Sequence, residues 1–200
     1  VLVLEATYGH PDCLLPSLGE TCTEMVYWAL KCLKEGRVPV FQVYSVGKAQ
    51  EVTKIFNEFT EVPVIVHPTV AKVNQAYEKN GVNLSYVSSN SDEGREVLRS
   101  KQCLWVIPNC HVDLPTQTYS IAIATGWALK FRSNRFGRAF PLSGHADFNQ
   151  LVAYVKQANP KEVLTTHGFK ADLANYLSRK LGIRARPIMA LKHKPLHEYF

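Results

Sequence analysis

Short strand-like runs alternate with helical stripes along most of the 200-residue chain. Residues 38–44 are β-branched or aromatic, as in a buried strand, and Ala49, Val52, Ile55, Phe56 and Phe59 then recur at helical spacing. Strands that alternate with helices indicate a mostly parallel sheet with helices on its faces. The sequence therefore predicts an α/β fold.

The same patterns predict the other elements. Strands are expected at residues 1–4, 62–66, 104–107, 121–125, 139–142 and 162–165, and helices at about 20–35, 70–80, 148–158 and 171–181. The polar segment 85–101 is expected to form a loop and a short exposed helix. No apolar run is long enough to cross a bilayer, and no membrane partner is expected. Because Val1, not Met, opens a strand-like run, we expect this sequence to be an excised part of a longer protein.

Charge and cysteine content narrow the class of protein. Lys and Arg total 23 against 17 Asp and Glu, a formal net charge of +6, which weakly favours polyanionic partners. The five cysteines form no C-x-x-C pair. Buried free thiols in a reducing, cytoplasmic environment explain them better than a disulfide framework or a thiolate metal site.

Two histidines follow expected strands directly, each beside a glycine. His145 comes after residues 139–142 and His167 after residues 162–165. The carboxyl ends of strands are where α/β proteins gather ligands and catalytic groups. Asp147 and Gln150 have the spacing of a helix capping box, so a structural role for Asp147 is at least as well supported as a catalytic one.

Four motifs, in order and spread over nearly the whole chain, resemble those of the β-CASP nucleases, a branch of the metallo-β-lactamase superfamily. They are Glu5-Ala6-Thr7-Tyr8-Gly9, Gly47-Lys48-Ala49-Gln50, Ser143-Gly144-His145-Ala146-Asp147 and Thr166-His167-Gly168. The closest likeness within the branch is to ligase-associated DNA exonucleases and archaeal messenger-RNA 3′-end processing factors. Phe169 stands where many RNA-cleaving members have Glu, which also favours the exonuclease group, with its link to DNA repair.

The resemblance implies a fold, a cofactor and site residues. A parallel-sheet β-CASP domain, residues 11–138, would be inserted in a partial αββα metallo-β-lactamase domain, residues 1–10 and 139–200. Two zinc ions would bind a hydroxide that attacks the phosphodiester. His167 would be a zinc ligand and His145 the general acid, with Glu5 hydrogen-bonded to it.

The family's main zinc cluster, His-x-His-x-Asp-His, is absent from this sequence. One ligand cannot hold two zinc ions, so we expect the 200-residue chain alone to be inactive and to bind no zinc. The missing metallo-β-lactamase half would then be its partner in the intact protein.

Basic residues are candidates for nucleic-acid binding. Lys130, Arg132, Arg135 and Arg138 are interleaved with aromatic residues and either track a phosphate backbone or form a solvated loop. Lys48 begins an expected helix, but its motif is not a full P-loop, and a packing turn that faces the substrate channel explains it better.

The sequence predicts that the intact protein is a zinc-dependent nuclease that cleaves DNA or RNA, with an exonuclease as the favoured form. The alternative is a non-catalytic nucleic-acid-binding or scaffold subunit of a processing complex. A homo-oligomer is left open, as are the choice between DNA and RNA and the polarity of cleavage.

Overall fold

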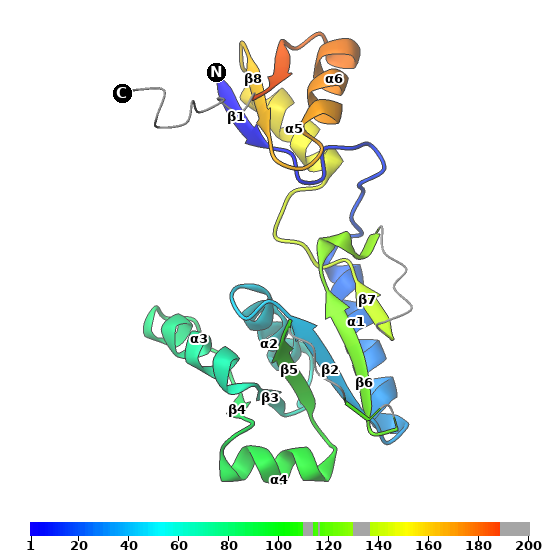
Figure 1. Cartoon of the computed structure of the whole chain (residues 1–200), viewed down its shortest axis with the longest axis vertical. Helices are drawn as coiled ribbons and strands as arrows, with labels where there is room; N and C mark the ends of the chain where they lie inside the picture. The colour runs from blue at the N-terminus through cyan, green and yellow to red at the C-terminus, as the bar shows by residue number, and fades with distance from the viewer. Residues whose placement is uncertain (110–113, 116, 130–136, 189–200) are drawn as a thin grey trace, which may run out of the picture. The chain divides into compact units, whose positions relative to one another are not determined.

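The computed structural model describes residues 1–109, 114–115, 117–129 and 137–188. The chain forms two compact units, coloured by sequence in Figure 1. Unit 1 combines Val1–Leu15 with Gly144–Phe200, and unit 2 is Pro16–Ser143. Both boundaries lie a few residues later than those expected for the two domains.

Unit 2 is built on a six-stranded sheet in the order β4-β3-β5-β2-β6-β7, in which every pairing is parallel. The strands are β2 (Val38–Val43), β3 (Val64–Val66), β4 (Val87–Ser88), β5 (Leu104–Pro108), β6 (Tyr119–Ala124) and β7 (Arg138–Phe140). All six residues of β2 are buried, as expected for a central strand covered on both faces.

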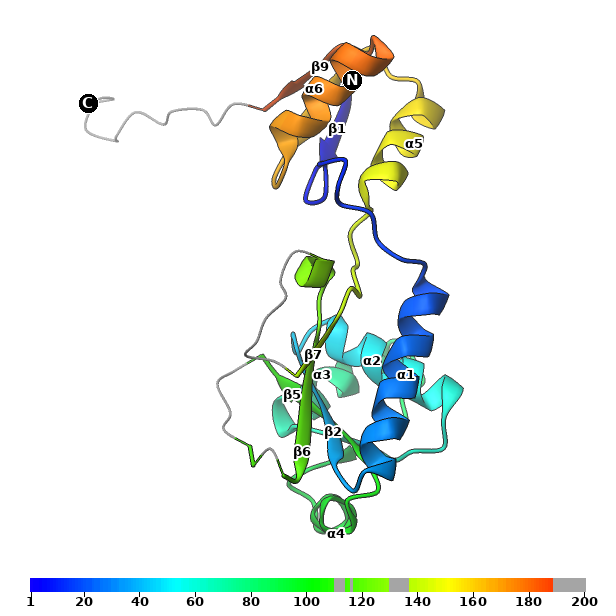
Figure 2. The ribbon, with the colours of Figure 1, turned by 90° about the vertical axis from the view of Figure 1, so that its right-hand side faces the viewer.

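Helices cover the sheet of unit 2. They are α1 (Leu18–Lys34), α2 (Lys48–Phe59), α3 (Pro68–Lys79) and α4 (Asp92–Ser100), with a short 3-10 helix η1 at Gly126–Leu129. α1 and α2 lie on the same side of β2 and β6 (Figure 2), where Met25 and Phe56 pack around Phe41 in the main core. The opposite face carries a smaller core around Val40 and Ile107.

Unit 1 contains a three-stranded parallel sheet in the order β1-β8-β9, made of β1 (Leu2–Glu5), β8 (Val163–Thr166) and β9 (Ala185–Pro187). The helices α5 (Phe148–Ala158) and α6 (Lys170–Leu181) supply Leu151, Val155, Leu173 and Leu177 to its core. The two segments of unit 1 are joined in this sheet, because β1 comes from the start of the chain and β8 from its later part.

The predicted α/β class with parallel sheets is confirmed, but three elements were not predicted. Strand β4 lies inside the segment 85–101, which was expected to hold only a loop and a helix; with two residues it is too short to show a period. β9 has the sequence Ala-Arg-Pro, and η1 is a four-residue turn that begins at Gly126, so neither carries an apolar alternation.

The expected free thiols are confirmed for Cys13, Cys22, Cys32 and Cys103, which are all buried and unbonded to one another. Burial raises the pKa of the Cys103 thiol to about 11, so this side chain stays neutral. Cys110 lies outside the described residues. No helix in the described part of the chain has the length and apolar content to span a membrane.

Candidate active site

The expected catalytic residues of unit 1 gather where β1 and β8 end. Glu5 is the last residue of β1 and pairs in register with Thr166, the last residue of β8. Because the strands are parallel, their carboxyl ends share one edge of the sheet. The pairing continues beyond the strands, since the Ala6 amide donates to the Thr166 carbonyl at 2.8 Å. The Glu5-Ala6-Thr7 and Thr166-His167-Gly168 motifs are therefore neighbours.

Glu5 and His145 lie close together, as the resemblance to the β-CASP nucleases implied. Nδ1 of His145 is 3.4 Å from Oε1 of Glu5, an ion pair when the imidazole is protonated. The Thr7 amide donates to Oε2 of the same carboxylate at 2.8 Å. Partial burial raises the pKa of Glu5, but hydrogen bonds from Thr7 and the positive charge of His145 outweigh it, and the net pKa is lowered. Glu5 is therefore a carboxylate near neutral pH and can orient and stabilise a charged imidazole.

Tyr8 limits the space around the imidazole from another side. Its side chain is only 3% exposed. The Tyr8 ring meets the His145 ring edge-on, with ring centroids 6.2 Å apart and planes inclined at 74°. His145 itself is half exposed, with 56% of its side chain accessible. The imidazole therefore has a fixed side formed by Tyr8 and Glu5 and an open side towards solvent, which suits a group that exchanges a proton with a substrate.

The turn after β8 is held in an unusual backbone conformation. His167 has a φ of 58° and Gly168 a φ of 41°. A Cβ atom at Gly168 would lie 2.4 Å from Cα of Thr7 and 2.5 Å from the Ala6 carbonyl oxygen, so only glycine fits. The amide of Phe169 also donates to the Ala6 carbonyl at 2.7 Å. Left-handed non-glycine residues persist where surrounding contacts enforce them, often at functional sites. The contact with Ala6 and Thr7 thus sets where His167 stands.

The ring of His167 has a partner for one nitrogen. Its Nδ1 lies 3.2 Å from Oγ1 of Thr166. The tautomer in which Nδ1 donates to this hydroxyl leaves the lone pair on Nε2, the form in which histidine binds a metal. Within residues 1–109, 114–115, 117–129 and 137–188, however, no three His, Cys, Asp or Glu side chains are grouped as a metal site. These residues do not by themselves fit a zinc ion.

Asp147 has a structural role. Its side chain accepts a hydrogen bond from the Gln150 amide at 2.8 Å, and the Gln150 side chain accepts one from the Asp147 amide at 2.9 Å, which makes the expected capping box of α5. Asp147 also accepts from the Leu15 amide at 3.2 Å. It therefore ties the helix that follows His145 to the segment that follows β1.

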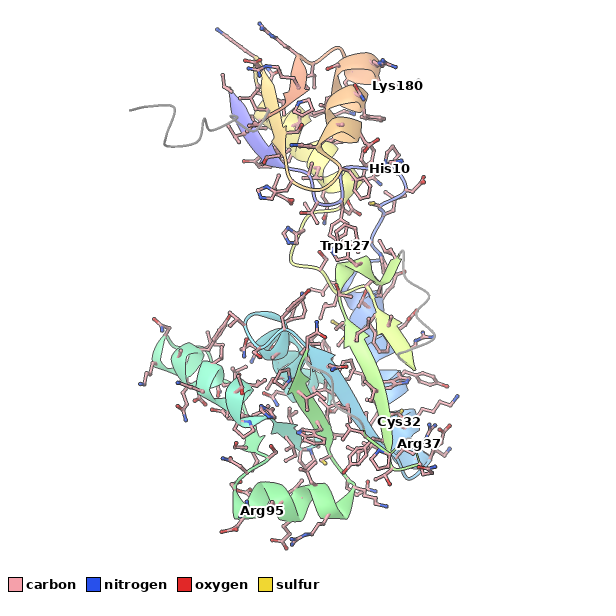
Figure 3. All side chains as sticks on the ribbon, viewed as in Figure 1. His10, Cys32, Arg37, Arg95, Trp127 and Lys180 are labelled. Carbon is pink, nitrogen blue, oxygen red and sulfur yellow. The ribbon has the colours of Figure 1, made fainter. Side chains whose placement is uncertain are left out.

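Two residues near the site have contacts that the sequence did not predict. Gly9 is needed by packing, because a Cβ atom there would lie 2.9 Å from both the Leu173 Cβ and the Phe169 carbonyl oxygen. His10 lies on the loop after β1 (Figure 3), with its ring 5.6 Å from that of Phe169 and Nδ1 accepting from the Asp12 amide at 3.2 Å. A histidine before a proline shows no signal for such a contact.

Of the residues expected to bind nucleic acid, the structure describes only Lys48 and Arg138. Lys130, Arg132 and Arg135 lie outside the described residues. Arg138 forms an ion pair with Glu24 at 3.0 Å, and Lys48 forms one with Glu51 in the first turn of α2. Each of these two cations already has a carboxylate partner, which weakens its attraction for phosphate. The Gln50 side chain holds the turn at residues 45–48 in place. It accepts a hydrogen bond from the Gly47 amide at 2.7 Å and donates one to the Ser45 carbonyl at 3.0 Å.

Comparisons with known proteins bear on this site. Residues 138–187, which include His145 and His167, match the family model described as "Zn-dependent metallo-hydrolase RNA specificity domain". The chain is 29% identical over 196 residues to a "Probable DNA ligase" of Opitutus terrae, covering 92% of this chain and 18% of that protein. It is 24% identical over 259 residues to "Transcription termination factor FttA" of Methanothermobacter thermautotrophicus, covering 96% of this chain and 41% of that protein.

A solved structure shares the fold. It is the crystal structure of a protein of unknown function from Enterococcus faecalis V583, with a TM-score of 0.55 and 15% identity over 96% of this chain and 50% of that one. All three of these proteins are much longer than the stretch that they share with this chain.

The edge of paired strands holds the Glu5–His145 pair and the His167-Gly168 turn, and His145 and His167 both fall within the stretch that resembles the metallo-hydrolase family model. The matches confirm the narrower resemblance found in the motifs: the chain carries the β-CASP type of metallo-β-lactamase-superfamily sequence. The description of the matched family implies zinc in the intact protein.

Proposed function

We propose that the intact protein is a zinc-dependent nuclease that hydrolyses phosphodiester bonds in DNA or RNA, with an exonuclease as the narrower form of the proposal. The observation that carries it is the His145–Glu5 pair, with 3.4 Å between Nδ1 and Oε1, beside the enforced His167-Gly168 turn. The family description and the two relatives support a role on nucleic acid.

In this proposal His145 holds the proton that the leaving oxygen receives. A leaving alkoxide is a strong base, and a protonated imidazole is acidic enough to neutralise it as the bond breaks. Glu5 stabilises the imidazolium before transfer and fixes the ring, so it acts as a positioning residue. Tyr8 restricts the ring from its buried side. No step is assigned to zinc, because the described residues do not form its site.

The test compares single variants in the full-length protein. We expect His145→Ala to lower the single-turnover cleavage rate by about 10²–10⁴-fold, the usual contribution of a general acid, with little change in substrate affinity. His167→Ala should lose zinc as well as activity, and Glu5→Gln should act mainly on the rate and its pH profile. Wild-type cleavage by His145→Ala would overturn the acid assignment, while loss of activity only in His167→Ala would leave the family proposal standing.

A second measurement separates the enzyme from a non-catalytic subunit. Elemental analysis of the 200-residue chain should find well under one zinc per chain, and the full-length protein should bind zinc stoichiometrically. A full-length protein that binds nucleic acid without zinc and without cleavage would establish the scaffold alternative. Stoichiometric, chelator-resistant zinc in the 200-residue chain would contradict our account of the ligands.

Nucleic-acid binding by the basic residues is also a proposal. Replacing Arg132 and Arg135 together with Ala should weaken binding to all sequences and flatten the dependence of log K on log salt by roughly one to two units. The control, Arg95→Ala on α4, removes an exposed arginine paired with Asp92 (Figure 3) and should leave that slope unchanged. An equal effect in both variants would show only a loss of net charge.

We also propose that the protein is cytoplasmic, because its described cysteines are buried free thiols.

A further inference from the structure

The sheet of unit 2 changes direction around β2. From β2 the chain passes through α2 to β3 on one side, returns to β5 beside β2, and then reaches β6 on the other side. In open parallel sheets, ligands bind outside the carboxyl ends of the strands at such a switch point. The structure has a cavity of about 150 Å³ at this place, lined by residues at the ends of β2, β5 and β6.

The strand register brings the lining residues together. Gln42 and Val43 near the end of β2 pair with Ile107 and Pro108 of β5, and Gln42 also pairs with Ile123 of β6. Asn109, which lines the cavity, directly follows β5, and Thr125 directly follows β6. All of these residues belong to unit 2, so the cavity needs no contribution from unit 1.

The chemistry of the lining is mixed in a way that suits a flat heterocycle. Val43, Ile123 and Ala124 supply an aliphatic wall, and Tyr44, 60% exposed, supplies an aromatic ring. The amide of Asn109, which is exposed, and the hydroxyl of Thr125 supply both donors and acceptors. The described residues that line the cavity are amides, a hydroxyl, a phenol and aliphatic groups, a set that matches the faces and polar edge of a heterocycle.

The volume restricts the ligand further. Cavities of about 150 Å³ accept a molecule of the size of benzene. One pyrimidine or purine ring is of this order, whereas a base pair or a peptide helix is far too large. Single-stranded nucleic acids are recognised by splaying out bases, stacking them on side chains and bonding their edges to polar groups.

We propose that this cavity receives one unstacked nucleobase of a single-stranded nucleic acid. The base lies between the Tyr44 ring and the aliphatic wall, with its polar edge towards Asn109 and Thr125. The inference rests on the proposed function, since that function supplies the nucleic acid. It adds a base-binding site on unit 2 that is separate in the chain from the candidate active site of unit 1.

The first experiment uses mononucleotides and the 200-residue chain, observed by NMR of its methyl groups. Uridine 5′-monophosphate should shift the methyl resonances of Val43, Ile123 and Ala124 through its ring current. Ribose 5-phosphate has the same sugar and phosphate without the base, and it should leave these resonances unchanged. Equal shifts with both compounds would show a phosphate site, and no shift with either would also overturn the proposal.

The second experiment pairs a cavity variant with an abasic ligand. Ile123→Trp enlarges a partly exposed side chain of the cavity lining, and it should weaken binding of a single-stranded oligouridylate by about tenfold, the order of one base stack. Binding of the matching abasic oligonucleotide should not change. Asn109→Leu at the exposed rim is the second variant if Ile123→Trp does not fold, and Gln75→Leu on the exposed surface of α3 is the control.

The outcomes separate this inference from the proposed function. Equal loss of affinity for the normal and abasic oligonucleotides would show that the variant affects binding of the sugar-phosphate backbone, and the base site would be wrong. If oligonucleotides bind but the variants and uridine 5′-monophosphate have no effect, the nuclease proposal survives without the base site. If uridine 5′-monophosphate binds in the cavity while no oligonucleotide binds to the full-length protein, the cavity is a mononucleotide site, and both the base site for single strands and the proposed function are wrong.

Discussion

Both units are built from alternating strands and helices, but different interactions hold their characteristic residues in place. In unit 2 the central strand β2 is buried along its whole length, and aromatic side chains fill the space between sheet and helices. In unit 1 the edge strand β1 is only partly buried, with Val3 59% exposed. Its distinctive residues are instead engaged at one edge of the sheet through hydrogen bonds, an ion pair and close backbone contacts. Burial explains most of unit 2, and specific contacts explain the motifs of unit 1.

The difference is clearest at glycines. Gly81 of unit 2 has a φ of 84° and open space around the position of a Cβ atom, so it only ends a helix. Gly168 of unit 1 has both a positive φ and backbone atoms of Thr7 in the space that a Cβ atom would take. The first glycine serves local geometry, and the second joins two distant motifs.

Removing the centre of the aromatic core should have the largest effect on stability. Phe41 is fully buried, and its ring lies 5.3 Å from Trp28 and 5.5 Å from Phe56. We expect Phe41→Ala to lower the free energy of unfolding by about 3–5 kcal/mol. Phe59→Ala, at an exposed position on α2, should change it by no more than about 0.5 kcal/mol. Urea denaturation measures both, and similar losses would break the claim that burial governs unit 2.

Gly168→Ala should follow in size. The new Cβ atom meets backbone, which cannot move without displacing Thr7, so we expect a loss of about 3 kcal/mol and a shift of the His145 and His167 resonances. Gly81→Ala is the matched control with the same sign of φ and no close atoms, and it should cost about 1 kcal/mol. Equal costs would mean that the contact with Thr7 contributes nothing beyond the backbone conformation.

The two helix caps give a smaller and sharper comparison. Asp147 of unit 1 and Ser17 of unit 2 both form capping boxes, but Asp147 is 8% exposed and also accepts from the Leu15 amide. Asp147→Ala should cost about 2 kcal/mol, because it leaves a second donor unpaired, and Ser17→Ala about 1 kcal/mol. Thermal unfolding followed by circular dichroism would show the order, and a larger loss for Ser17→Ala would contradict it.

Sequence reasoning reached the elements that have an apolar period, in both units. The helices α1 and α2 and the strand β2 of unit 2, and the helices α5 and α6 of unit 1, were predicted to within a few residues. The motifs brought Glu5 and His145 together correctly, and the Asp147–Gln150 spacing predicted its capping box. The role of Gly168 in holding the Thr7 turn could not be predicted, because a close approach between distant segments leaves no periodic trace. Strand β9 was missed for the same reason, since its pairing with β8 and not its composition makes it a strand.

The smallest expected effect is the dependence of stability on pH. Glu5 of unit 1 and Glu20 of unit 2 both have a lowered pKa. At Glu5 partial burial raises the pKa, but hydrogen bonds from Thr7 and the positive charge of His145 lower it by more. At Glu20, which is exposed, hydrogen bonds from Ser17 lower the pKa. A carboxyl group whose pKa is lower in the folded state than in the unfolded state stabilises the fold when the pH is above its unfolded-state pKa. This contribution is lost as the pH falls through its folded-state pKa. For both residues the loss therefore begins below the ordinary pKa of 4.5.

Glu5→Gln should consequently reduce the free energy of unfolding near neutral pH by about 0.5 kcal/mol or less, since water screens a partly exposed pair. The deficit should vanish on acidification through the folded pKa, where wild-type Glu5 is itself neutral. Glu20→Gln is the matched control, because glutamine also completes a capping box and the side chain is fully exposed, so little change is expected at either pH. Denaturant titrations at neutral and acidic pH measure both differences. A Glu5→Gln deficit that persists in acid would show that the carboxylate contributes through shape and not charge, and the electrostatic account of the His145 pair would have to be abandoned.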